Sequence, residues 1–434
     1  MVSMVHEALG RAACEPLVRT QKSGVPLRSD QDPRRWSILA LLSVAVLLGM
    51  SVWFTASAVA PVLQIRWNLN SSQIAWLTTT VQLGFVAGTM AAAILNLADL
   101  IPSRGYFAVS AILAASANAF LVIVPVYGGA LGLRFLTGFF LAGVYPPAMK
   151  MSATWFRSSR GVAIGTVVGA LTVGKAIPYL FKLTASAPLQ VVVLGASTGG
   201  VLGGVLVAWA YREGPYAFEK AAFSWKLIAR VISHRPTRLA TYGYLGHMWE
   251  LYAMWTWVPA FLSASALARA GATGTPVSAA LIDLAGFSAI AIGGLGCVWG
   301  GRAADRIGRT RLVNLAMGVS GVCSLVVGLL FGQSFWVLVP FMLIWGFFVV
   351  ADSAQFSAMV TEVAPQEAVG TALTLQTSLG FLLTMVTIQG VPMLRDSLGW
   401  HLAFPVLALG PMLGIGAILK LDVNQSDRAS SRSK

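Results

Sequence analysis

The chain has 434 residues, and only 11% of them are Asp, Glu, Lys or Arg, whereas 56% are apolar. A soluble domain has about a quarter charged residues, so the composition excludes a water-soluble globule, and the apolar content excludes a disordered chain. The formal net charge of +14 would favour nucleic-acid binding only if the basic side chains formed a patch interleaved with aromatic residues. They are instead spread between apolar runs, so no nucleic-acid partner is expected.

The cysteines and the N-terminus add little. Cys14, Cys297 and Cys323 are widely spaced and odd in number, which indicates neither a disulfide framework nor a metal site. No cofactor is expected. Residues 1–35 carry charges throughout and lack the apolar core of a signal peptide, so they are predicted to be a cytoplasmic arm.

Apolar runs dominate the rest of the chain, and each is long enough for a membrane helix of about 20 residues. Twelve are predicted, at about 37–62, 73–95, 106–127, 131–152, 160–182, 189–211, 238–263, 277–299, 311–332, 335–358, 369–392 and 400–420. They lack the alternation of barrel strands. The fold class is therefore an all-α membrane protein.

The basic residues give this protein an orientation. With the N-terminus inside, most Lys and Arg residues fall in inner segments, and the outer loops hold only Arg66, Lys182, Arg269 and Arg395. This bias follows the positive-inside rule. It predicts an inner (plasma) membrane protein with both termini cytoplasmic.

A polar stretch at 212–237 separates six runs from six runs. It predicts a six-helix bundle at 36–211, a cytoplasmic loop at 212–237, a second bundle at 238–421 and a cytoplasmic tail at 422–434. Asp99 and Asp305 are 206 positions apart, and Gly138 and Gly346, each followed by two Phe residues, are 208 apart. Similar offsets indicate a duplicated unit and two pseudo-symmetric bundles.

The stretch GRAADRIGR (301–309) resembles the loop signature of the major facilitator superfamily. The matching residues are Gly301, Asp305, Arg306, Gly308 and Arg309. In the first half Asp99 is in register and Arg104 lies one place late, so that copy is degraded. The resemblance implies a twelve-helix secondary transporter and an inner gate at these residues, where a carboxylate and guanidinium groups pair when the inner mouth closes. The alternative is that these charged residues only keep the loop on the inner side of the membrane and so fix the orientation of the helices.

Ionisable side chains inside membrane helices are costly and usually functional. Arg134, which begins a stretch resembling the family's fourth-helix signature, is a candidate anion contact or a structural partner of a carbonyl or an acid. Lys175 lies near mid-membrane, where it is predicted to contact the solute or form an ion pair. The resemblance places these residues on helices that line or flank a central cavity.

Glu250 and His247 are three residues apart and are predicted on one helix face. Both are proton-coupling and substrate-path candidates, because their charge responds to burial and neighbours. The alternative is a salt bridge from Glu250 to Arg134 or Lys175. Asp283 is a further proton-coupling candidate, whereas Asp352 is expected to be wetted near the inner end.

Uncharged polar and aromatic side chains complete the predicted substrate path. They are Trp53, Ser57, Tyr145, Trp255 and Gln376. Helix packing and interhelical hydrogen bonds are the commoner use of such residues.

Together these features predict a monomeric, proton-coupled symporter in a lipid bilayer that moves a small, anionic solute by alternating access. No nucleotide-binding loop of the GxxxxGK[ST] kind is present, so direct ATP drive is not expected, and neither is an enzyme. A proton-antiport efflux carrier for hydrophobic or cationic compounds is the alternative.

Overall fold

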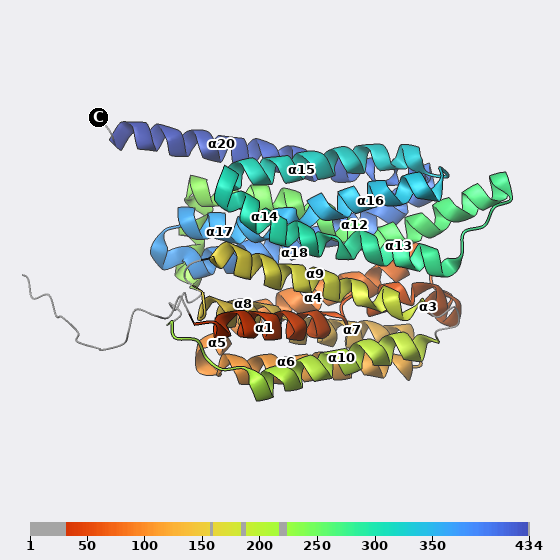
Figure 1. Cartoon of the computed structure of the whole chain (residues 1–434), viewed down its shortest axis with the longest axis horizontal. Helices are drawn as coiled ribbons and strands as arrows, with labels where there is room; N and C mark the ends of the chain where they lie inside the picture. The colour runs from red at the N-terminus through yellow and green to blue at the C-terminus, as the bar shows by residue number, and fades with distance from the viewer. Residues whose placement is uncertain (1–31, 157–158, 184–187, 217–223, 433–434) are drawn as a thin grey trace, which may run out of the picture. The chain divides into compact units, whose positions relative to one another are not determined.

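The computed structural model describes residues 32–156, 159–183, 188–216 and 224–432. Within the compact unit Pro33–Lys434, the helices lie side by side along a common direction (Figure 1). The described residues form helices and no strands, as the fold class predicts. Most of the predicted arm lies outside the described residues, as do the side chains of the predicted tail.

We define the N-half as helices α1–α10 and the C-half as helices α12–α20. The N-half contains α1 (Arg34–Met50), α2 (Thr55–Ala58), α3 (Ala60–Trp67), α4 (Ser71–Ile94), α5 (Leu97–Leu100), α6 (Ser103–Ala119), α7 (Tyr127–Leu141), α8 (Tyr145–Ala153), α9 (Arg160–Phe181) and α10 (Leu189–Ala210). The short α11 (Ile228–Ser233) precedes the C-half. The C-half contains α12 (Arg235–Thr273), α13 (Ala279–Ala291), α14 (Gly293–Ile307), α15 (Arg309–Val326), α16 (Phe335–Ala351), α17 (Ser353–Val363), α18 (Val369–Leu398), α19 (Trp400–Ala403) and α20 (Leu409–Arg432).

Eleven stretches of the described helices are long and apolar enough to cross a membrane. The first predicted run is the exception, because turns at residues 51–54 and 59 divide it into α1, α2 and α3. Pro61 in the first turn of α3 has no backbone N–H to continue the preceding hydrogen-bond ladder. The break brings the consecutive aromatic residues Trp53 and Phe54 to fully buried positions.

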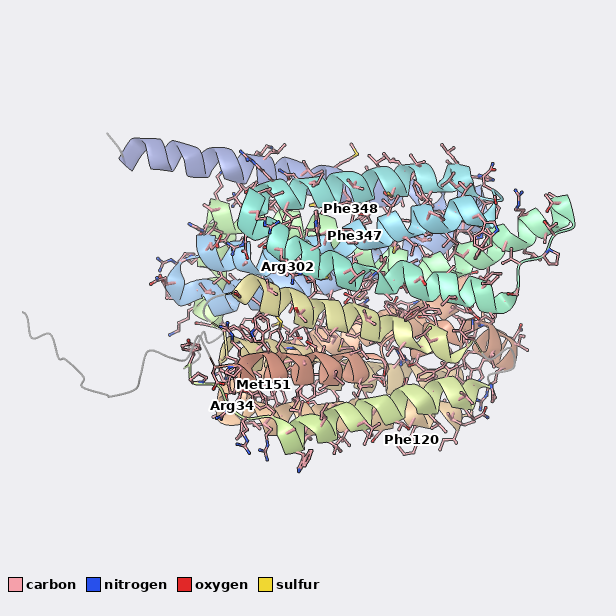
Figure 2. The ribbon with its side chains drawn as sticks, in the orientation of Figure 1. Arg34, Phe120, Met151, Arg302, Phe347 and Phe348 are labelled. Atoms are coloured by element: carbon pink, nitrogen blue, oxygen red, sulfur yellow. The ribbon has the colours of Figure 1, made fainter. Side chains whose placement is uncertain are left out.

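The fourth long helix of each half breaks. In the N-half the break separates α7 from α8, and Pro146 lies in the first turn of α8. In the C-half the break lies at Asp352, between α16 and α17. Phe347 and Phe348, labelled in Figure 2, precede this break. Their ring centroids lie 5.5 and 5.8 Å from that of Trp299 on α14.

Helices pack mainly within each half, for example α4 with α7 and α12 with α20, but α9 contacts α13 and α14, and α4 contacts α18. The α9–α14 contact is close because glycines face it. A Cβ on Gly165 would lie 2.7 Å from the Cys297 carbonyl oxygen, and one on Gly169 would lie 2.7 Å from that of Gly294. Small residues allow such backbone approach. The division into two six-helix domains stays a prediction.

The ends of the helices differ in charge. We call the end where α1, α12 and α15 begin the basic end, because the signature arginines and Arg34 lie there. Figure 2 shows Arg34 and Phe120 toward opposite ends. The connections after α9 and α12 belong to the other end, which we call the opposite end.

Candidate functional site

Lys175 is the buried cation of the predicted path. It extends from α9, is 1% exposed, and donates a hydrogen bond to the Tyr252 hydroxyl of α12. Its Nζ lies 4.1 Å from the centroid of the Trp53 ring, 4.4 Å from that of Tyr252 and 5.2 Å from that of Trp255. Cation–π attraction is strongest for such a desolvated ammonium. In the described part of the chain, no carboxylate forms an ion pair with Lys175.

Aromatic rings from both halves contact this ammonium or pack on the rings that do. We call Lys175 and these six rings the central cluster: Trp53, Tyr252 and Trp255 contact the ammonium, and Phe54, Phe85 and Phe381 pack on them. The Trp53 centroid lies 5.2 Å from that of Phe85 and 5.8 Å from those of Tyr252 and Phe381. All six rings are buried. The cluster therefore joins the N-half to the C-half across the predicted path.

Several polar side-chain atoms near this cluster in sequence have no hydrogen-bond partner within the described ranges. They are Nε1 of Trp53 and of Trp255, both amide atoms of Gln82 on α4, and Nε2 of Gln376 on α18. A buried polar atom without a partner is costly in hydrocarbon. These atoms are thus candidate contacts for a polar solute, and Gln82 adds to those predicted.

The contacts of Arg134 are those of a structural partner of backbone carbonyl groups, which was the alternative to an anion contact. Its guanidinium, 1% exposed, donates to the carbonyl oxygens of Val52 (3.1 Å), Leu77 (3.4 Å) and Trp53, and to the Asn118 amide oxygen at 2.8 Å. Two of these carbonyls belong to the turn between α1 and α2. Arg134 therefore holds in place the turn that carries Trp53, rather than facing the central cluster.

Glu250 lies on α12 and is 1% exposed. Its two oxygens accept hydrogen bonds from the Ser320 hydroxyl at 2.7 Å and the Trp345 indole N–H at 2.8 Å. The expected alternative, a salt bridge to Arg134 or Lys175, is wrong, because both donors belong to the C-half. Within the described residues the carboxyl group contacts neutral donors and no cation.

His247 and Asp352 form a second buried contact in the C-half. Nδ1 of His247 lies 3.0 Å from Oδ1 of Asp352, and their side chains are 2% and 1% exposed. The expectation that Asp352 is wetted is therefore wrong: it sits inside the break between α16 and α17. Although His247 and Glu250 are one turn apart, they contact different partners.

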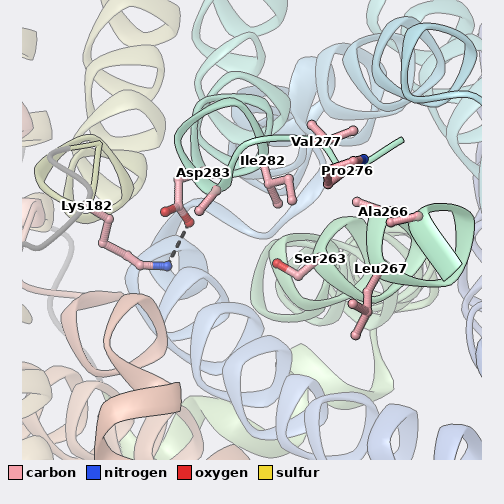
Figure 3. Close-up of a pocket in the computed structure, with 10 residues that line it drawn as sticks. Lys182, Ser263, Ala266, Leu267, Pro276, Val277, Ile282 and Asp283 are labelled. Atoms are coloured by element: carbon pink, nitrogen blue, oxygen red, sulfur yellow. Dashed lines mark hydrogen bonds and ion pairs between the residues drawn. The ribbon is translucent and has the colours of Figure 1, made fainter. Parts of the chain in front are cut away.

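Asp283 pairs across the two halves at the opposite end. Its Oδ1 lies 2.7 Å from Nζ of Lys182, which follows α9 (Figure 3). The pair borders a cavity of about 360 Å³ lined by α12, the loop after it and α13. Ser263 and apolar side chains such as Ile282 complete the lining. Lys182 was predicted only as an outer-loop charge.

The predicted inner gate lies at the basic end. Asp305 approaches the first turn of α9, where a Cβ on Gly161 would be 3.2 Å from its Oδ2, and Gly301 faces Gly161 directly. Gly308 adopts a φ of +87° between α14 and α15, a conformation that favours glycine. Arg309 pairs with Glu362 of α17.

The remaining predicted residues are dispersed. Arg104 and Arg306 are exposed, and the side chain of Asp99 lies outside the described residues. Ser57 shares a 2.6 Å hydrogen bond with Thr78 of α4. Tyr145 begins α8 and is half-buried.

Sequence reasoning named Trp53, Lys175 and Trp255, which the structure brings together, but not Phe85 and Phe381. No motif distinguishes these two phenylalanines from the other 19 of the 21 in the chain. Tyr252 and Trp255 are three residues apart and therefore lie on one helix face. This spacing was the sequence signal for the part of the central cluster that the C-half contributes.

Comparisons with known proteins give a family. The family model described as "Major Facilitator Superfamily" matches residues 41–388. A bacterial homologue of the human lysosomal transporter Spinster, in an inward-facing and unoccupied conformation, has a TM-score of 0.63 and 15% identity, covering 90% of this chain and 95% of that chain. A mutant of the nucleoside transporter NupG has a TM-score of 0.65 and 13% identity, covering 88% and 99%. No curated protein matches the sequence.

At these identities the two structures show the fold alone, whereas the family match spans most of the chain. The described helices add the length and apolar composition of a multi-pass membrane protein. The chain therefore belongs to the Major Facilitator Superfamily and is an integral membrane transporter of a small solute.

Proposed function

We propose that this transporter moves a small anionic solute and that Lys175 is the solute's anchoring cation. The observation that carries the proposal is an ammonium buried in the membrane region against rings and a hydroxyl, without a carboxylate partner among the described residues. An ammonium without a counter-ion is costly there. Separation of the halves would expose it to water, where an anionic solute supplies the missing charge.

The proposed driving force is a proton gradient, used in symport. Glu250 supports this part of the proposal, because both of its oxygens accept from neutral donors. Without a nearby cation, the buried ionised form is uncompensated, and binding a proton removes that cost. The proposed setting is an inner membrane with both termini cytoplasmic, where the protein acts as a monomer, and the placement of basic residues supports the orientation.

Efflux of hydrophobic or cationic compounds is the second candidate. The observation that favours it is the same group of rings, because three of them already hold an ammonium. A cationic solute would take the place of Lys175 against these rings. Lys175 would then be an internal competitor rather than an anchor.

Uptake into proteoliposomes, with a panel of anionic and cationic solutes and with or without a pH gradient, separates the two candidates. We expect anion uptake by the parent and its loss in Lys175→Ala, with Lys226→Ala as a control that removes an exposed lysine. If Lys175→Ala transports every anion normally, the anchoring role is wrong. Faster transport of cations by the same variant would establish the efflux candidate.

Glu250→Gln tests the coupling. We expect the variant to exchange solute across the membrane but to lose accumulation driven by the pH gradient. Glu367→Gln is the control, because Glu367 pairs with Arg230 and is half exposed. Accumulation by Glu250→Gln at the parent's level would show that Glu250 is not required for coupling.

A further inference from the structure

His247 and Asp352 form a buried acid–base pair outside the central cluster. His247 lies on α12, and Asp352 occupies the break between α16 and α17. Their nitrogen and oxygen are 3.0 Å apart, and neither side chain is more than 2% exposed. Within the described residues, no Lys or Arg forms an ion pair with either group.

Apolar and weakly polar groups surround the pair. The rings of Phe356 and Tyr244 lie 5.2 and 6.2 Å from the His247 ring, centroid to centroid. Glu250 of α12 and Cys297 of α14 are titratable groups on neighbouring helices that the charge of Asp352 reaches. A net charge on the pair therefore has little compensation.

The hydrogen bonding of the pair is incomplete. Although Nδ1 and Oδ1 are close, Oδ1 has no aligned donor, and Nε2 of His247 has no partner in the described part of the chain. With neutral His247 and ionised Asp352 the pair carries one negative charge. One added proton, on either group, makes the pair neutral overall, and this is the cheaper state in hydrocarbon.

We propose that His247 and Asp352 together bind the coupling proton and that Asp352 is its second carboxylate site beside Glu250. This inference rests on the proposed proton-coupled transport and names where the proton resides. The 3.0 Å contact makes His247 and Asp352 one proton-binding group.

The position of Asp352 connects this group to the motion. α17 begins directly after Asp352 and contacts both α14 and α9, which belongs to the N-half. Opening the basic end would separate α17 from α9 and admit water near the pair. Water lowers the cost of the negative state, so the proton leaves on that side and is retained while the halves are closed.

Transport assays test the assignment with Asp352→Asn and His247→Gln. We expect both variants to keep solute exchange and to lose accumulation driven by the pH gradient. Asp396→Asn and His401→Gln, which alter residues at the opposite end, should accumulate solute normally. Asp352→Glu, which keeps a carboxylate, should recover part of the coupling and guards against a folding defect in Asp352→Asn.

Accumulation by both Asp352→Asn and His247→Gln at the parent's level would overturn the inference while leaving anion transport and Glu250 intact. Conversely, absence of pH-driven accumulation in the parent would remove the proposed coupling itself. The two failures are therefore distinguishable.

A spectroscopic measurement tests the contact without transport. The chain has four histidines, so ¹⁵N-histidine spectra are simple, and His247→Gln identifies the His247 signals. We expect the Nδ1 chemical shift of His247 to change when Asp352 is replaced by Asn and to stay in place in Asp396→Asn. An unchanged Nδ1 shift in Asp352→Asn would show that the two groups do not share a proton.

Discussion

At the scale of single residues, the two buried cations Arg134 and Lys175 differ in what they contact. Arg134 donates to backbone carbonyls and an amide oxygen, all within the N-half. Lys175 reaches from the N-half into rings and a hydroxyl of the C-half. The first arrangement can persist while the halves move, whereas the second is broken whenever they separate.

Arg134→Ala should therefore reduce stability rather than solute recognition. Its removal leaves buried carbonyl groups without donors, at about 1–3 kcal/mol for each group, so we expect a total loss of about 3 kcal/mol or more. Thermal unfolding in detergent measures the change, with exposed Arg306→Ala as control. If Arg134→Ala instead unfolds at the same temperature as the control but is no longer stabilised by added solute, Arg134 belongs to the solute site.

The sequence was sufficient to identify which residues are costly in a membrane, because charge and apolar context are local properties. It was insufficient to say which of them meet. Glu250 and His247 share a helix face by spacing, yet they contact α15–α16 and the α16–α17 break respectively. Such partners depend on the distance between helices, which a single sequence does not contain.

At the scale of helices, the glycines of α9 control how closely the halves approach. Gly165→Ala should weaken the closed arrangement by about 1–3 kcal/mol, because the added methyl group overlaps a carbonyl oxygen of α14. Gly132→Ala on α7 is the matched control, since no atom lies within 4 Å of its added Cβ.

The native thiol of Cys297, 1% exposed at this contact, reports the change. With Cys14 and Cys323 replaced by Ser, we expect maleimide to modify Cys297 faster in Gly165→Ala than in Gly132→Ala. Equal rates would indicate that the glycine contact does not limit opening.

The Lys182–Asp283 pair joins α9 to α13 at the opposite end. Its partial exposure suggests a modest coupling energy of about 0.2–1 kcal/mol. We expect Lys182→Gln and Asp283→Asn each to change the uptake rate, and the exchanged pair Lys182→Asp/Asp283→Lys to restore it. A double-mutant cycle on uptake rates measures this coupling.

Other outcomes of this cycle assign the residues differently. If the exchanged pair fails while Asp283→Asn behaves normally, Lys182 is needed for its own charge. Asp283 was predicted to couple protons, and loss of pH-driven accumulation in Asp283→Asn would support that role.

At the scale of the whole protein, the basic residues predict which end faces the cytoplasm. In a cysteine-free variant, Thr275→Cys at the opposite end should react with a membrane-impermeant maleimide in intact cells. Ser233→Cys at the basic end should react only after the cells are opened. The reverse pattern would contradict the predicted orientation.

The helical architecture was accessible from the sequence because hydrophobic length and repeated offsets specify it. The first run was wrongly predicted as one helix, because the turn between α1 and α2 is as apolar as the helices and leaves no signal in the hydropathy. That turn is held by Arg134, a contact over 81 and 82 positions in the chain. The departure from the predicted helix thus depends on a contact between residues far apart in the sequence. Trp53 lies in the turn that this contact holds.

The central cluster also has a thermal consequence. Opening the halves wets rings that are now dry, and exposure of apolar surface to water raises the heat capacity. The association of these rings weakens on cooling. The free energy that favours the closed over the open state should therefore decrease at low temperature. A plot of the logarithm of the open-to-closed ratio against inverse temperature should be curved rather than straight.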